Sequence, residues 1–153
     1  MNHPIHELED LKSLSIEDLD QLFNNGQCPN LKSLEGIAKG LVIHPAWFAR
    51  LKLWRGKVFQ ISSSTELTGL NRLGLGRLEI QRYPFNARIG KSLFSDRPVL
   101  IINHNLSANP YWVRRYHDEM VQIDSHIYLA TSHYKMGKKL KFVSYFAFDL
   151  SQK

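Results

Sequence analysis

The chain of 153 residues is long enough for one domain with a substantial core, and its 43% hydrophobic content excludes an intrinsically disordered protein. A single cysteine excludes an intrachain disulfide, and the lack of a long apolar run or a signal-peptide pattern leads us to expect a cytoplasmic protein. The net charge of +6 is unevenly placed: residues 1–25 hold six acidic residues against one lysine, so the remainder is strongly basic and suited to an anionic partner.

Residues 4–25 have the pattern of short helices. Pro4 suits the first turn of a helix, and Ser15–Asp18 resembles a capping box, in which side chains satisfy the first free amides of a helix. Gly26 ends this pattern. We therefore predict an acidic helical arm over residues 1–30 and one β-rich folding unit over residues 31–153. The apolar stripe of the second helix consists of Ile16, Leu19, Leu22 and Phe23.

From Leu31 onward the apolar residues follow the period of two that is typical of strands. A first strand over 34–43 precedes a helix that Pro45 opens and that runs through Trp54, whereas residues 62–76 are rich in turn residues and receive no assignment. Short links between the later segments favour an antiparallel meander, and no alternation of strands and helices indicates a parallel sheet. The remaining predicted strands are 57–61, 78–83, 87–89, 99–104, 117–123, 126–134 and 141–150.

These elements define the predicted fold class. We expect a mainly β protein, an antiparallel up-and-down barrel or a strongly curved sheet, with short N-terminal helices and one helix inserted after the first strand.

Several familiar site motifs are absent from the sequence. The glycines of residues 69–76 do not form a phosphate-binding loop or a dinucleotide-binding fingerprint, and there is no nucleophile elbow. The histidines are scattered and lack the spacing of metal ligands. We therefore expect neither a metal nor a cofactor.

The predicted helix at 46–54 combines aromatic and basic residues. Trp47, Leu51 and Trp54 share one face, and positive charge nearby comes from Arg50, Lys52, Arg55 and Lys57. One interpretation is a helix packed over the end of a barrel. The other is a lid, or a helix that contacts an anionic membrane through its aromatic and basic side chains.

A second mixed segment, Tyr111–Glu119, interleaves aromatic residues with two arginines. Such a pattern can stack bases and hold phosphates. It has no RNA-recognition signature and occurs once in the chain, so nucleic-acid binding is not favoured.

Two charged residues are predicted to share strand faces with aliphatic residues. Glu119 alternates in phase with Val121 and Ile123, whereas Asp118 lies on the more polar face, and Arg82 alternates in phase with Ile80. An unpaired charge in an apolar interior costs several kcal/mol. We therefore expect Arg82 and Glu119 to line a cavity together or, alternatively, to form only a structural pair or lie at the rim.

The overall plan resembles the calycin group, the lipocalins and fatty-acid-binding proteins. The resemblance covers residues 31–150 and rests on the glycine-containing strand Glu35–Gly40, the helical insertion Ala46–Trp54 and the closing hairpins that end at 145–150. It implies a barrel that encloses an apolar ligand cavity, with a portal helix after the first strand. Lipocalins have Gly-x-Trp on the first strand where this chain has Gly36-Ile37-Ala38, so no functional residue is transferred by motif.

The sequence thus favours binding of a small, largely apolar ligand, lipid-like or carboxylate-bearing, in a barrel cavity. One alternative is a small enzyme that uses Glu119 or Asp118 as general acid or base near Tyr128 or His133. Another is a peripheral membrane or scaffold protein that uses the basic aromatic helix. The predicted ligand-contacting residues are Arg82, Glu119, Tyr128, Phe146 and Trp47.

Overall fold

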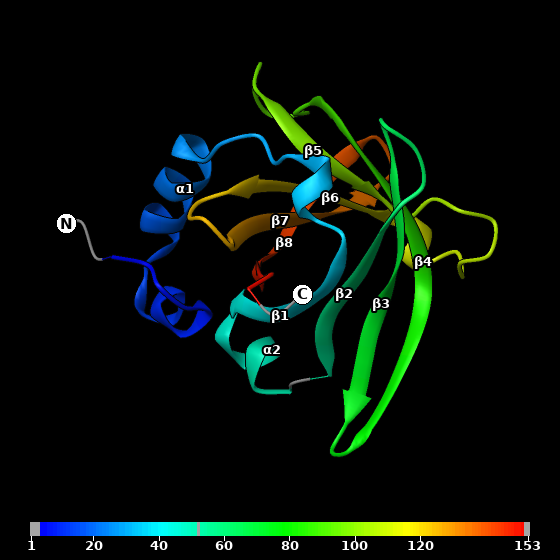
Figure 1. Ribbon diagram of the computed structural model, residues 1–153, viewed down its shortest axis with the longest axis horizontal. Helices are drawn as coiled ribbons and strands as arrows, with labels where there is room; N and C mark the ends of the chain where they lie inside the picture. Colours follow the sequence, from blue (N-terminus) through cyan, green and yellow to red (C-terminus); the bar gives the residue numbers. More distant parts are fainter. Residues whose placement is uncertain (1–3, 52, 152–153) are drawn as a thin grey trace.

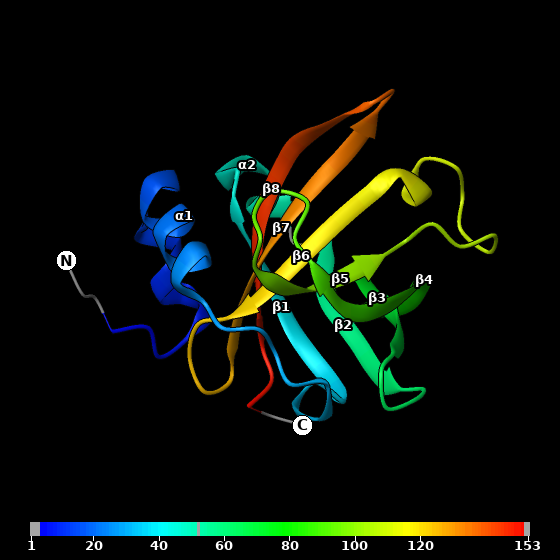
Figure 2. The same cartoon turned by 90° about the horizontal axis from the view of Figure 1, so that it is seen from above.

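The computed structural model describes residues 4–51 and 53–151, without the side chains of residues 49–51. Eight antiparallel strands each pair with the next in sequence, and β8 pairs with β1, which closes the barrel (Figures 1 and 2). The predicted fold class is confirmed. The strands are β1 (Gly36–His44), β2 (Trp54–Ile61), β3 (Leu67–Leu75), β4 (Leu78–Lys91), β5 (Pro98–Asn103), β6 (Tyr116–Gln122), β7 (Ile127–Met136) and β8 (Lys139–Asp149).

Short helices precede and connect the strands. The capping box predicted at Ser15 is formed: its hydroxyl accepts a hydrogen bond from the Asp18 amide at 3.1 Å, and the Asp18 carboxylate accepts one from the Ser15 amide at 3.2 Å. The helices are η1 (Leu8–Ser13), α1 (Ile16–Asn25), η2 (Leu31–Ser33), α2 (Ala46–Leu51) and η3 (Val113–Arg115).

The unassigned segment 62–76 contains the whole of β3. Its glycines serve close strand contact more than turns: a Cβ at Gly69 would lie 1.9 Å from the Val58 carbonyl oxygen of the neighbouring strand. The helix predicted through Trp54 ends instead at Leu51, and Trp54 begins β2. The three-residue face predicted for Trp47, Leu51 and Trp54 is therefore not formed.

The strands predicted at 78–83 and 87–89 are one long strand, β4, interrupted by a bulge. The pairing of β3 with β4 shifts by one residue between Leu70 and Asn71, and Tyr83 adopts a φ of 60° there. Such a bulge reverses the in-and-out alternation of the strand beyond it.

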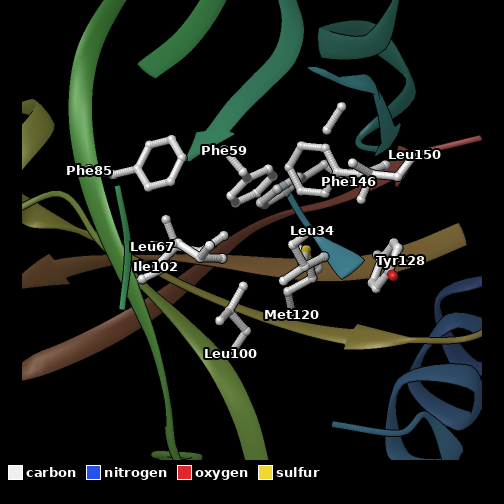
Figure 3. Packing of buried hydrophobic residues seen from close by; sticks show 14 residues of the cluster. Leu34, Phe59, Leu67, Phe85, Leu100, Ile102, Met120, Tyr128, Phe146 and Leu150 are labelled. Carbon is white, nitrogen blue, oxygen red and sulfur yellow. The ribbon is translucent and has the colours of Figure 1, made fainter. Parts of the chain in front are cut away.

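The barrel wall is buried on both faces at β1 and β5–β8. One cluster fills the interior (Figure 3), and a second lies outside, where η1 packs on β1 and β8 and α1 packs on β7. The Tyr145 hydroxyl donates a hydrogen bond to Asp20 of α1, which ties the helical arm to β8. The inner cluster includes Phe59, Leu67, Phe85, Leu100, Ile102, Met120, Tyr128 and Phe148; the outer one includes Ile5, Leu8, Leu11, Leu19, Val99, Val121, Leu129 and Ala147.

The two ends of the barrel differ. We call the open end the one where β1–β2, β3–β4, β5–β6 and β7–β8 are connected; there the interior is hollow. The interior toward the opposite end is filled by the inner cluster. In the described part of the chain, no helix has the length and apolar character needed to cross a bilayer.

Candidate functional site

A cavity of about 680 Å³ occupies the open half of the barrel. Its walls come mainly from β2, β3, β4, β8 and the connection before β6. Most of the wall side chains are apolar. This volume and lining suit a small apolar molecule. Prominent wall residues are Leu53, Leu73, Leu78, Ile80, Trp112 and Phe146.

The inner end of the cavity is polar and is formed by Lys57, Asn71, His104 and Asp118, which we call the polar floor. Lys57 alternates with Phe59 on β2, so both side chains point inward, and Lys57 is only 2% exposed. Its Nζ lies 2.6 Å from Asn71 Oδ1 and 3.2 Å from His104 Nε2, and 4.6 Å from the centre of the Phe85 ring. The ammonium group thus has two hydrogen-bonding neighbours and one aromatic ring beside it.

Burial controls the charges of Lys57 and His104. Burial lowers the pKa of Lys57 to about 8, opposed by the negative charge of Asp118. Burial, and then the Lys57 charge, hold the pKa of His104 well below its usual range. At neutral pH the lysine is therefore mainly charged and the imidazole neutral. Since Lys57 donates to His104 Nε2, the ring carries its proton on Nδ1, which lies 3.8 Å from Asp118 Oδ2.

Two polar-floor residues have a buried polar atom without a hydrogen-bond partner among the described residues, His104 at Nδ1 and Asp118 at Oδ1. Asp118 alternates with Met120 on β6, points inward and is 5% exposed. Burial raises its pKa, an effect opposed by the positive charge of Lys57 and by a hydrogen bond from the Ser132 side chain to the carboxyl group. Among the described residues, its Oδ1 has no hydrogen-bond partner although it is buried. A buried carboxylate oxygen without a donor is costly, and a ligand that donates a hydrogen bond would remove this cost.

Glu119 is buried, but on the outer face of β6. It alternates in phase with Val121 of the outer cluster. Its carboxylate accepts hydrogen bonds from the Ser92 hydroxyl and the Leu93 amide, the latter at 2.9 Å, and lies 2.7 Å from His117 Nε2. Burial alone would raise the pKa of Glu119, but the hydrogen bonds from His117, Ser92 and Leu93 lower it overall. Glu119 anchors the β4–β5 loop and does not line the cavity.

Arg82 does not line the cavity either. It is exposed, and its guanidinium carbon lies 5.5 Å from the centre of the Tyr83 ring. Because of the bulge in β4, Tyr83 faces the cavity next to Arg82. The expected pairing of Arg82 with Glu119 is therefore wrong, and Lys57 is the cation of the interior.

The other predicted residues lie at three different places. Phe146 borders the cavity. Tyr128 belongs to the packed inner cluster toward the opposite end (Figure 3), so it does not contact the cavity. Trp47, at 66% exposed, lies on α2 against Phe48. The predicted aromatic and basic helix also included Arg50, Leu51 and Lys52. The side chains of these three residues lie outside the described part of the structure.

The polar floor as a group was not predicted, although Asp118 was named as an alternative general acid or base and the sequence contains a signal for two of the other members. Lys57 is in phase with Phe59, and His104 is in phase with Leu100 and Ile102. A polar residue in phase with a buried apolar series is the pattern that marks an interior polar group. Asn71 fell in the unassigned segment and had no such signal.

The chemistry available at the polar floor is hydrogen bonding and charge pairing. In the part of the chain that the structure describes, no group of three or more His, Cys, Asp or Glu residues is arranged to hold a metal ion. The floor instead presents one unpartnered carboxylate oxygen beside a buried cation and a neutral imidazole. It can therefore recognise a polar group at the end of an apolar molecule.

Comparisons with known proteins identify a structure of similar fold but no family. No protein-family model and no curated protein matches the chain. A crystal structure of a protein from Thermomonospora curvata is similar, with a TM-score of 0.55 and 12% sequence identity; the match covers 89% of this chain and 87% of that chain. At this identity the similarity concerns the fold alone.

Proposed function

We propose that this protein binds a small, lipid-like molecule in its barrel, with the apolar body in the cavity and a polar head group on the polar floor. The observation that carries the proposal is the unpartnered Oδ1 of buried Asp118 at the inner end of an apolar cavity. The resemblance to the calycin group supports the same role.

The polar floor also favours a particular head group. Lys57 and Asp118 have opposite charges, and Lys57 already contacts Asn71, His104 and the Phe85 ring. A neutral head that donates a hydrogen bond to Asp118, such as an alcohol, needs no further charge. A carboxylate head would meet the Asp118 carboxylate, so we expect an alcohol to bind more tightly than an acid of equal chain length.

The test is displacement of the fluorescent probe 1-anilinonaphthalene-8-sulfonate by dodecanol and by dodecanoate. The wild-type protein should bind dodecanol more tightly. In Asp118→Asn the charge of Lys57 is left uncompensated, so the preference should change to dodecanoate, by roughly tenfold or more in the ratio of affinities. Lys57→Met should bind dodecanoate more weakly than the wild type does, because it removes the buried cation.

Glu119→Gln is the matched control, because it makes the same carboxylate-to-amide change on the outer face of the same strand. Its ratio of affinities should equal that of the wild type. The proposal is wrong if neither compound displaces the probe, or if Asp118→Asn and Glu119→Gln change the ratio equally.

A further inference from the structure

The open end of the barrel concentrates positive charge. Half of the chain's 20 lysines and arginines lie on its described loops and adjoining strand segments without being buried, whereas Glu79 is the one acidic residue there that is not buried. That carboxylate is neutralised by Arg72, whose Nη2 lies 2.9 Å away. The basic residues are Arg55, Arg72, Arg77, Arg82, Arg114, Arg115, Lys135, Lys138, Lys139 and Lys141.

The same end also exposes large apolar side chains. Leu75 and Leu78, at the tip of the β3–β4 hairpin, are 73% and 77% exposed, and Ile80 follows at 51%. Figure 1 shows this hairpin reaching beyond the rest of the barrel on the side where α2 lies. Trp47, Tyr111 and Trp112 are also more than half exposed on this end. Exposed apolar groups surrounded by basic ones are typical of surfaces that enter a membrane interface.

We propose that the open end is a docking surface for an anionic lipid bilayer. In this arrangement Leu75 and Leu78 enter the interfacial region of the lipids, and nearby arginines such as Arg77 and Arg82 face the head-group phosphates. The charge complementarity between a basic end and an anionic surface carries this choice of partner.

A bilayer fits the surface better than a nucleic acid does. The most exposed apolar residues at the hairpin tip are leucines, which have no aromatic face for stacking a base. In addition, the guanidinium groups of Arg55 and Arg72 are engaged by the Gly76 carbonyl and by Glu79, so they hold the hairpin in place.

The docking surface surrounds the cavity mouth, because Leu75, Leu78 and Ile80 line the cavity and are exposed at the same time. A docked protein would therefore exchange a ligand with the bilayer without passing it through water. This last step rests on the proposed function; docking itself does not.

Vesicle flotation tests the docking surface. The wild-type protein should float with vesicles of phosphatidylcholine that contain about 30% phosphatidylglycerol, and much less with phosphatidylcholine alone. Raising the salt from about 0.1 M to about 0.5 M NaCl should weaken binding, because screening shortens the reach of the charges. Equal binding to both kinds of vesicle, or no binding to either, would overturn the proposal.

Matched charge reversals locate the surface. Arg77→Glu with Arg82→Glu should reduce the affinity for anionic vesicles by about tenfold or more. Lys32→Glu with Lys91→Glu makes the same charge change at the opposite end and should have a much smaller effect. Equal losses in the two double variants would mean that net charge alone causes the binding, which contradicts a docking surface.

Matched serine substitutions test insertion. Leu75→Ser with Leu78→Ser should weaken vesicle binding, whereas Ile61→Ser with Leu93→Ser, exposed away from the open end, should not. A single-stranded oligonucleotide is assayed in parallel. If it binds and the vesicles do not, the surface serves nucleic acid and the proposal fails.

Dodecanol binding without vesicles separates this proposal from the proposed function. The Arg77→Glu/Arg82→Glu variant should retain it, because neither side chain belongs to the polar floor. Loss of vesicle binding with intact dodecanol binding confirms a separate docking surface. Loss of both would show that the substitutions disturb the barrel, and would contradict the assignment of these arginines to docking.

Discussion

At the scale of single residues, the neighbours Asp118 and Glu119 show how surroundings decide the role of a carboxylate. Burial acts on both, yet the pKa of Asp118 is raised and the pKa of Glu119 is lowered. The difference arises because Glu119 is stabilised by hydrogen bonds from His117, Ser92 and the Leu93 backbone, whereas Asp118 has one from Ser132 and its Oδ1 has no partner among the described residues. Glu119 is thus satisfied by the fold, while Asp118 remains able to bind a ligand.

The lowered pKa of Lys57 predicts a specific pH dependence of stability. The lysine titrates near pH 8 in the folded state and near its usual 10.5 when unfolded. Below pH 8 it is charged in both states, so the full cost of burying the charge is present. Above pH 8 the unfolded state binds more protons, so the free energy of unfolding should rise relative to Lys57→Met by up to about 1.4 kcal/mol per pH unit.

Urea unfolding of wild type and Lys57→Met between about pH 7 and pH 9.5 measures this difference. Taking the difference between the two unfolding free energies cancels the effect of titrating groups that both proteins contain. A difference that stays constant or falls across this range would contradict a buried lysine with a lowered pKa.

At the scale of elements, β6 belongs to the part of the barrel wall, β5–β8, that is covered on both faces. Met120 packs in the inner cluster and Val121 in the outer one, beneath the N-terminal helices. The acidic arm therefore contributes to the stability of the barrel wall, through apolar contacts and through the hydrogen bond from Tyr145 to Asp20. The division into an arm over 1–30 and a barrel over 31–153 stays a prediction.

Leu19 of α1 provides a test of how the arm and the barrel are coupled. Leu19→Ala removes a side chain that is 1% exposed and should lower the free energy of unfolding by about 2–4 kcal/mol. Gln21→Ala, at an exposed site of the same helix, should change it by less than about 0.5 kcal/mol. Urea unfolding followed by the circular dichroism of the strands gives both values. If the arm unfolds independently, the barrel transition will not move in either variant.

At the scale of the whole molecule, the barrel is closed and part of its interior is hollow. The pairing of β8 with β1 closes the sheet on itself, and one half of the interior is packed while the other half is open. The packed half stabilises the fold, which allows the open half to keep a cavity and buried polar groups.

Closure depends on the close approach of β1 and β2 at Gly56. Its φ is 122°, and a Cβ there would lie 2.0 Å from the Ala38 carbonyl oxygen. Gly56→Ala should therefore separate the two strands, expose their edges and cause aggregation or failure to fold.

Gly76→Ala is the matched control for this prediction. Gly76 also has a positive φ, of 59°, but a Cβ at this position would meet no atom within 4 Å, so the variant should stay folded and lose only about 1 kcal/mol. Size-exclusion chromatography and thermal unfolding distinguish the two. A Gly56→Ala protein as stable and monodisperse as Gly76→Ala would contradict the packing described for β1 and β2.

The sequence by itself determined the class of fold, because strand alternation and helix capping are local properties of neighbouring residues. The period change near Leu31, the capping box at Ser15 and the last three strands all appear in the structure. Alternation divides a strand into two faces, but it does not say which face points inward.

Only the tertiary structure decided the candidate site. On β6 both faces are apolar because different parts of the chain cover each, so Glu119 and Asp118 were assigned to the wrong faces. At the bulge, Tyr83 lines the cavity while Arg82 before it is exposed, which alternation along the strand does not predict. The polar floor forms when residues 57, 71, 104 and 118 meet through barrel closure, and such long-range convergence has no local signal in the sequence.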